Sequence, residues 1–120
     1  MTAGLSPRLA RWCSAWHSLD RDRIIALYGE HAVHESPAVA RLLPAHGGTR
    51  LVGRAQIAGY IAAACERLRS LRFEPLHVLE AGDVTVMEYR RTTNDEPAIN
   101  VCEVVQWQGD TVIASRVYHA

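Results

Sequence analysis

The sequence predicts an α+β fold in which helices cover one face of an antiparallel sheet. Residues 84–119 form three β-rich runs, which are separated by the turn residues at 94–97 and 109–110. Residues 7–71 instead hold segments whose apolar residues recur at helical spacing. A chain of 120 residues is long enough for one core, so we expect residues 1–120 to form a single domain.

Composition argues against several classes of partner. Thirteen arginines balance 13 Asp and Glu residues, so the formal net charge is zero and we expect neither nucleic acid nor a membrane surface as partner. No apolar run approaches the roughly 20 residues that span a bilayer. The three cysteines form no Cys-x-x-Cys pair, and the N-terminus shows no leader pattern. Reduced thiols in a cytoplasmic protein are therefore expected.

The first helix is predicted from its start signal and its apolar face. Ser6 can serve as the N-cap, and Pro7 occupies the first helical position. Trp12 and Trp16 lie one turn apart, so they are expected to share one buried face.

A second, shorter helix is expected to begin after Asp20, which can cap it, and to extend through Tyr28, with Gly29 as its stop. A short extended segment is expected at 31–37, where a proline ends it. Residues 38–52 are expected to be a loop with one helical turn, and this loop is a candidate lid or rim of a pocket.

The longest helix is predicted over residues 54–71, because its apolar residues, Tyr60 among them, form one stripe. A strand at 73–80 follows, and a turn then leads into the three β-rich runs. The predicted order is three helices with one short strand between them, and then four strands.

Short segments along nearly the whole chain carry a family resemblance in their order and spacing. They are Leu19-Asp20, Leu27-Tyr28, residues 32–37, residues 53–57, residues 82–84, Gly109-Asp110 and residues 113–118. This set resembles the nuclear transport factor 2-like superfamily, in its SnoaL-like and ketosteroid-isomerase-like branch. The resemblance implies a cone, in which a strongly bent antiparallel sheet wraps around the long helix, with two further N-terminal helices and a mostly apolar pocket at the open mouth. Such folds host enzymes, binding modules and dimerisation domains.

Alternation along the strands indicates which side chains enter such a pocket. On the run 98–107 the more apolar set, which contains Glu103, is expected to face inward. On the run 84–91 alternation leaves the facing open, and the family pattern selects the set that contains Tyr89. The expected binding residues are Trp12, Trp16, Ser36, Tyr60, Met87, Tyr89, Arg91, Val101, Val105 and Val117.

Glu103 is the sharpest candidate for chemistry, because a carboxylate on an apolar strand face must be paired or protonated. In ketosteroid isomerases the matching position carries an acid that is held neutral and donates a hydrogen bond to the substrate oxyanion. The resemblance therefore makes Glu103 a candidate acid or oxyanion donor. An internal ion pair with Arg91 or Arg116 is the open alternative.

The rest of the isomerase constellation is absent. Ser36 stands where the family has its general-base aspartate, and Trp12 stands where it has a phenolic donor, so authentic steroid isomerisation is not expected. His34 and His119 are candidate replacement bases, because the ordinary pKa of histidine suits proton transfer. Each can equally be a hydrogen-bonded wall residue.

No metal or other cofactor is predicted. His31 and His34 would point to opposite sides of a strand, and Gly47-Gly48 lacks the nucleotide-binding pattern. The open functions are an isomerase-, cyclase- or hydratase-type enzyme acting on a small hydrophobic compound, a non-catalytic carrier of such a ligand, and a dimerisation domain. A homodimer would pair the outer sheet face, which carries Val86, Cys102 and Val104.

Overall fold

The computed structural model describes residues 4–119; residues 1–3, which belong to the segment in which no leader was expected, and Ala120 lie outside this range. The helices are α1 (Pro7–Ser18), α2 (Arg21–Ile25), α3 (Pro37–Leu42) and α4 (Arg54–Arg67), with a short 3-10 helix, η1 (Pro44–His46). The strands are β1 (Tyr28–Glu35), β2 (Arg50–Val52), β3 (Leu71–Ala81), β4 (Val84–Thr93), β5 (Ile99–Gln108) and β6 (Thr111–His119). None of the helices within residues 4–119 has the length and apolar character needed to span a bilayer.

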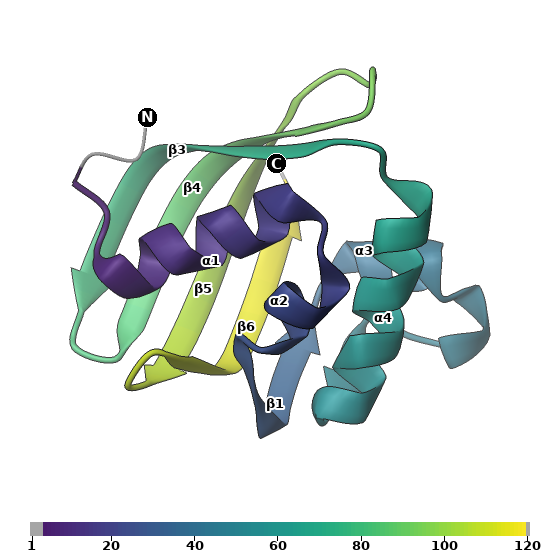
Figure 1. Ribbon diagram of the computed structural model, residues 1–120, viewed down its shortest axis with the longest axis horizontal. Helices are drawn as coiled ribbons and strands as arrows, with labels where there is room; N and C mark the ends of the chain where they lie inside the picture. The colour runs from purple at the N-terminus through teal and green to yellow at the C-terminus, as the bar shows by residue number, and fades with distance from the viewer. Residues whose placement is uncertain (1–3, 120) are drawn as a thin grey trace.

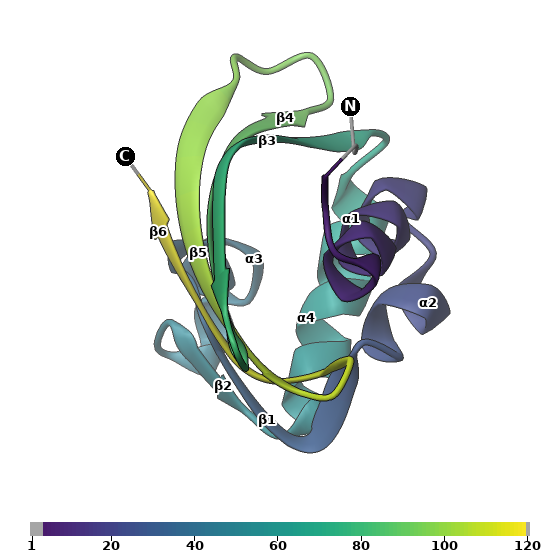
Figure 2. The same cartoon turned by 90° about the vertical axis from the view of Figure 1, so that its left-hand side faces the viewer.

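The strands form one sheet in the order β2-β1-β6-β5-β4-β3. All neighbours are antiparallel except β1 and β6, which are parallel. The sheet is strongly curved, and α1, α2 and α4 lie on its concave side (Figures 1 and 2). The α+β class and the bent, cone-like sheet are thus confirmed.

Helix α1 begins and ends as its sequence indicates. The Ser6 hydroxyl accepts a hydrogen bond from the Leu9 amide at 3.4 Å, and Pro7 follows the cap. At the other end Leu19 adopts the left-handed conformation, with φ of 52°, and its N–H donates to the Trp16 carbonyl. The buried face packs on β3 and α2.

Helix α2 is shorter than predicted. Asp20 does cap it, because its carboxylate accepts hydrogen bonds from two backbone amides. The prediction that the helix reaches Tyr28 is wrong, since α2 ends at Ile25 and Tyr28 begins β1. The Val112 amide of β6 donates to the Leu27 carbonyl at 2.8 Å, and this bond draws the chain into the sheet.

The segment 38–52 was predicted as a loop with one helical turn; α3 confirms that turn, whereas β2 was not predicted. The Ser36 hydroxyl caps α3 by accepting from the Ala38 amide at 3.2 Å, and Pro37 is its first helical residue. Strand β2 pairs with β1, with Val52 opposite Val33. A strand of three residues is too short for an alternation signal, so the sequence did not reveal it.

Helix α4 ends at Arg67, four residues before the predicted end at Leu71. Asn94, in the β4–β5 connection, accepts hydrogen bonds from the backbone amides of Arg69 and Ser70 and fixes the extended link into β3. Strand β3 tolerates Pro75 because it is an edge strand and its pairing shifts next to that residue.

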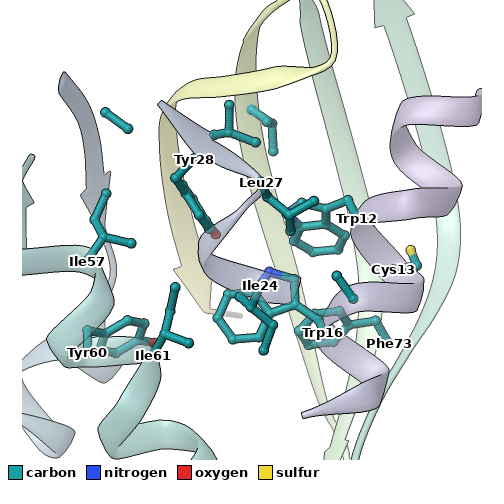
Figure 3. Close-up of a cluster of buried hydrophobic side chains, with 14 of the residues drawn as sticks. Trp12, Cys13, Trp16, Ile24, Leu27, Tyr28, Ile57, Tyr60, Ile61 and Phe73 are labelled. Atoms are coloured by element: carbon teal, nitrogen blue, oxygen red, sulfur yellow. The ribbon is translucent and has the colours of Figure 1, made fainter. Parts of the chain in front are cut away.

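The core fills the space between the concave sheet face and the helices. Figure 3 shows Trp12, Trp16 and Phe73 on one side of this cluster, residues of α4 such as Tyr60 on the other, and Tyr28 between them. Trp12 stacks on Phe73 with ring centroids 5.1 Å apart. On β4 and β5 the predicted inward sets are the buried ones, which confirms the facing that the family pattern selected.

Candidate functional site

A cavity of about 480 Å³ lies at the end of the concave face where β4 turns into β5. Its walls come from α1, α3, α4 and the strands β1 and β3 to β6, and its size lies in the range of small-molecule sites. The predicted site residues that line it are Trp12, Trp16, His34, Ser36, Tyr60, Tyr89, Arg91, Glu103 and Val117.

Glu103 and Tyr89 form a buried pair on neighbouring strands. The Tyr89 hydroxyl donates to Oε1 of Glu103 at 2.7 Å, and only 2% of each residue is exposed. Burial raises the pKa of Glu103 to about 7, although the hydrogen bond from Tyr89 and the charge of Arg91 act to lower it. Burial and the nearby Glu103 carboxylate raise the pKa of Tyr89, which therefore stays a hydrogen-bond donor.

The ion-pair alternative for Glu103 does not match this geometry. No cationic group of residues 4–119 lies within 4.0 Å of its carboxylate oxygens. Arg116 is exposed on the convex face, and Arg91 lies close enough to lower the pKa of Glu103 without pairing with it. Tyr89 binds Oε1, and Oε2 has no hydrogen-bond partner within the described chain.

His34 enters the same cavity from β1. Its Nδ1 lies 2.6 Å from the hydroxyl oxygen of Ser115 on the neighbouring strand β6. Burial lowers the pKa of His34 to about 4, so the ring is neutral at pH 7. The bond at Nδ1 fixes the ring orientation, and Nε2 makes no hydrogen bond within residues 4–119.

Aromatic side chains make most of the apolar wall. The indole N–H groups of Trp12 and Trp16 have no hydrogen-bond partner within the described range. Both lie near the Tyr28 hydroxyl and lower its pKa, although burial and Glu103 raise that pKa more strongly. Tyr60, on α4, has a ring centroid 5.4 Å from that of His34, and burial raises its pKa to about 12.

Four predicted site residues do not line the cavity. Met87, Val101 and Val105 are fully buried in the core beneath it, so their place in the structure does not support the predicted contact with a ligand. His119, predicted as a possible base, also lies outside the lining, at the end of β6 opposite Val101. Its Nε2 is buried and has no partner in the described residues.

The cavity also contains residues that the sequence did not indicate. Ala38, Arg41 and Leu42 come from α3, in the segment predicted as a lid or rim. Ala64, Arg67 and Leu68 come from the end of α4, while Leu71 and Phe73 come from the start of β3. Period-2 alternation of Leu71 and Phe73 was a usable signal, whereas nothing in the sequence shows that two helix ends meet at one rim.

No three His, Cys, Asp or Glu side chains within residues 4–119 come together as metal ligands. His31 is exposed whereas His34 is buried, as expected for residues on opposite sides of this strand. The three cysteines of this range are free thiols, and burial raises the pKa of Cys13 to about 11.

Solved structures share this architecture at low sequence identity. A SnoaL-like protein of unknown function from Burkholderia thailandensis is 23% identical, with a TM-score of 0.78 over 92% of this chain and 89% of that one. A Catenulispora acidiphila protein with a ketosteroid isomerase-like fold, in complex with trimethylamine, is 18% identical, with a TM-score of 0.74 over 95% and 85%. A putative polyketide cyclase from Sinorhizobium meliloti is 15% identical, with a TM-score of 0.76 over 98% and 99%.

At these identities the structures establish the fold and leave the activity open. The search of curated proteins found no match. The model of the SnoaL-like domain matches residues 9–115, which is most of the chain. The resemblance that the sequence suggested is therefore confirmed, and the protein belongs to the SnoaL-like domain family.

Proposed function

We propose that this protein binds a small, mostly apolar carbonyl compound in the cavity and catalyses an isomerase- or cyclase-type reaction on it. The observation that carries the proposal is the Glu103 carboxyl group, which lines the cavity, has one hydrogen-bond partner and has a pKa of about 7. Catalytic acids are matched to the working pH in this way. The free thiols suit a reducing compartment such as the cytoplasm.

Glu103 would act first as a proton donor. With Tyr89 donating to Oε1, the neutral acid carries its proton on Oε2 and directs it to a substrate carbonyl oxygen. When a proton leaves the neighbouring carbon, negative charge develops on that oxygen, and the Glu103 proton stabilises it. Because the carboxyl group is buried, such a bond is worth more there than in water.

His34 would remove the carbon-bound proton. This role requires the tautomer in which Nδ1–H donates to Ser115, so that Nε2 presents its lone pair to the cavity. The lowered pKa keeps the ring neutral at pH 7 but also makes it a weak base. Weak bases can serve where the oxyanion is well stabilised, which is the division of labour that Glu103 and His34 offer.

In a cyclase-type reaction the enolate carbon would attack a second carbonyl of the same ligand. The alkoxide formed there would take the proton that His34 had removed, so that both His34 and Glu103 end neutral. The aromatic walls would hold the flexible ligand folded. A putative polyketide cyclase shares the fold, so a cyclase-type reaction is proposed beside simple isomerisation.

A dimerisation domain is the second candidate, because the convex sheet face exposes apolar side chains. Leu79, Val86 and Val104 are neighbours across β3, β4 and β5, and Tyr118 lies opposite Cys102. Leu79 is 74% exposed and Tyr118 is 53% exposed. A second copy of the chain would cover this face in an isologous homodimer. Val86→Arg would then convert a dimer into a monomer in sedimentation, while an unchanged mass would exclude this face.

Deuterium exchange tests the enzymatic proposal directly, with 2-tetralone as the probe. The wild-type protein should bind the ketone, measured as a thermal shift, and should accelerate exchange of its α-protons in D2O. Glu103→Gln keeps the shape of the side chain but cannot transfer a proton, so it should slow exchange at least about tenfold and remove the pH dependence near 7.

Glu88→Gln is the matched control, since Glu88 lies on the convex face of the adjacent strand, opposite Cys102. It should exchange protons at the wild-type rate. If the ketone binds but exchange is equally fast in all three proteins, Glu103 has no catalytic role and the protein is a carrier. If no ketone binds, the proposed use of the cavity is wrong.

A further inference from the structure

Three arginines surround the mouth of the cavity. Arg41 is at the end of α3, Arg67 is the last residue of α4, and Arg91 is on the inward face of β4. Arg91 is half-buried, and the other two are exposed. These side chains come from three separate elements, and all three line one opening.

None of the three makes an ion pair or a side-chain hydrogen bond within residues 4–119. Some other arginines of this range do, since Arg8 bonds Glu80 and Arg69 pairs with Asp95, whereas the exposed Arg90 and Arg116 on the convex face do not. The guanidinium groups at the mouth therefore keep their donors available. Arg91 is the most informative case, because a half-buried cation without an acceptor forgoes part of its hydration.

The charges of Arg41 and Arg91 reach the same interior groups. Both lower the pKa of Tyr60, against the larger effect of burial, and both add to burial in lowering the pKa of His119. Arg91 also lowers the pKa of Glu103. Two arginines from different elements thus act on the same two side chains, one of which, Tyr60, lines the cavity.

The anionic groups that line the cavity do not balance these positive charges. Glu96 is exposed on the β4–β5 hairpin, and Glu103 is only partly ionised at pH 7, because burial raises its pKa to about 7. Three cations therefore face at most two anions, in a protein whose overall formal charge is zero. The excess lies where a ligand would enter.

We propose that Arg41, Arg67 and Arg91 form a carboxylate-binding subsite, and that the ligand of the cavity is an aromatic or polycyclic carboxylic acid. This inference rests on the proposed function, since it takes the cavity to be a ligand site. The guanidinium fork matches a carboxylate in a bidentate manner, and several arginines can share its two oxygens. The aromatic walls formed by Trp12, Trp16 and Phe73 accept the apolar body.

This arrangement also orients the ligand. With the carboxylate held at the mouth, the apolar body extends inward to Glu103 and His34. The ligand carboxylate would remain at the Arg91 end, away from the buried acid, so the two negative groups need not share one site. A neutral ligand of the same shape could enter in either direction.

The test compares 2-anthracenecarboxylate with 2-anthracenecarboxamide, which has nearly the same shape but no charge. Fluorescence titration at pH 7 and low salt should give a dissociation constant for the carboxylate at least about tenfold lower, because charge-assisted hydrogen bonds are the stronger ones. Added salt should weaken binding of the carboxylate and leave that of the carboxamide unchanged.

Arg91→Gln should remove most of this preference while carboxamide binding stays at the wild-type level. Arg90→Gln is the matched control, because Arg90 is the preceding residue on the same strand and is exposed on the convex face. It loses the same charge and should keep the preference. Equal binding of the two probes to the wild-type protein would overturn the carboxylate subsite and leave the ligand site standing. Binding of neither probe would overturn both.

Discussion

The two ends of the sheet differ in whether their polar side chains have hydrogen-bond partners. At the turn end, where β3 meets β4 and β5 meets β6, the Trp107 indole donates to Thr85 at 2.9 Å, and Thr85 donates to Glu80 at 2.6 Å. Arg8 also bonds Glu80, at 3.2 Å, donates to the Gly82 carbonyl and lies over the Trp107 ring. Each of these four side chains thus has a polar or aromatic partner in one hydrogen-bonded network.

At the cavity end the partners are missing. Glu103 has one hydrogen bond, the indoles of Trp12 and Trp16 have none within the described chain, and Arg91 has no acceptor. The pKa of Glu80 is lowered, because the bonds from Thr85 and Arg8 outweigh the raising effect of burial, whereas burial raises the pKa of Glu103 to about 7. Unsatisfied buried groups are uncommon in folded proteins, and their concentration at one end is a reason to propose that end as the site.

The largest expected difference between the ends concerns two tryptophans. Trp107→Ala should lower the free energy of unfolding by about 3–5 kcal/mol, because it empties a fully packed site and leaves Thr85 without its donor. Trp16→Ala should cost at least about 1 kcal/mol less, since Trp16 already borders empty space. Urea denaturation of both variants measures this, and equal losses would mean that the cavity end is packed as tightly as the turn end.

The pH dependence of stability should separate the two glutamates. The folded-state pKa of Glu103 is raised from 4.5 to about 7, so its neutral form favours folding, and this stability is lost as the pH rises through 7. The loss between pH 5 and 9 should be about 3 kcal/mol, from a shift of about two and a half pKa units. Glu103→Gln should flatten this decline in a series of urea titrations.

Glu80→Gln is the contrasting variant. Its lowered pKa means that the ionised form favours folding, and that this contribution is present at neutral pH and lost on acidification. The variant should therefore be less stable than the wild type at pH 7 and equal to it at low pH. His34 also lowers the stability on acidification. Its pKa is lowered from 6.5 to about 4, so protonating the buried ring disfavours the folded state. If the free energy of unfolding of Glu103→Gln fell between pH 5 and 9 as that of the wild type does, the raised pKa of Glu103 would be wrong.

A smaller effect is expected at the hydrogen bond between His34 and Ser115. Ser115→Ala should lower the free energy of unfolding by about 1–2 kcal/mol, since it leaves the buried Nδ1 without a partner. Without this bond the neutral imidazole should populate both tautomers, which NMR of the ring nitrogens can detect. Ser14→Ala removes the hydroxyl that bonds Arg23 on the exposed side of α1 and should cost less than about 0.5 kcal/mol. Equal losses would mean that the His34 bond contributes no more than a surface contact.

Much of the fold was predictable because its signals are local. Caps at Ser6 and Asp20 and the alternation around Glu103 each depend on a few neighbouring residues. The end of α2 was not predictable, because the parallel pairing with β6 that pulls Leu27 into the sheet joins segments far apart in the sequence. Within the site, the family pattern gave the inward face of β4 but not the depth of each side chain, so Met87 was expected in the cavity and lies beneath it. Arg41 and Arg67 come to line the same cavity only after α3 and α4 have packed against each other, so the sequence could not show it.

The smallest expected effect tests the single partner of Glu103. Tyr89→Phe removes one buried hydrogen bond and should lower the free energy of unfolding by about 1 kcal/mol. The Tyr89 bond lowers the pKa of Glu103, so without it that pKa should rise above 7, and the alkaline decline in stability should begin at higher pH. Tyr118→Phe, on the exposed face of β6, should leave both quantities unchanged. A midpoint that stayed at 7 in Tyr89→Phe would show that the Tyr89 bond does not lower the pKa of Glu103. The cavity end would then hold an isolated carboxyl group rather than a tuned pair.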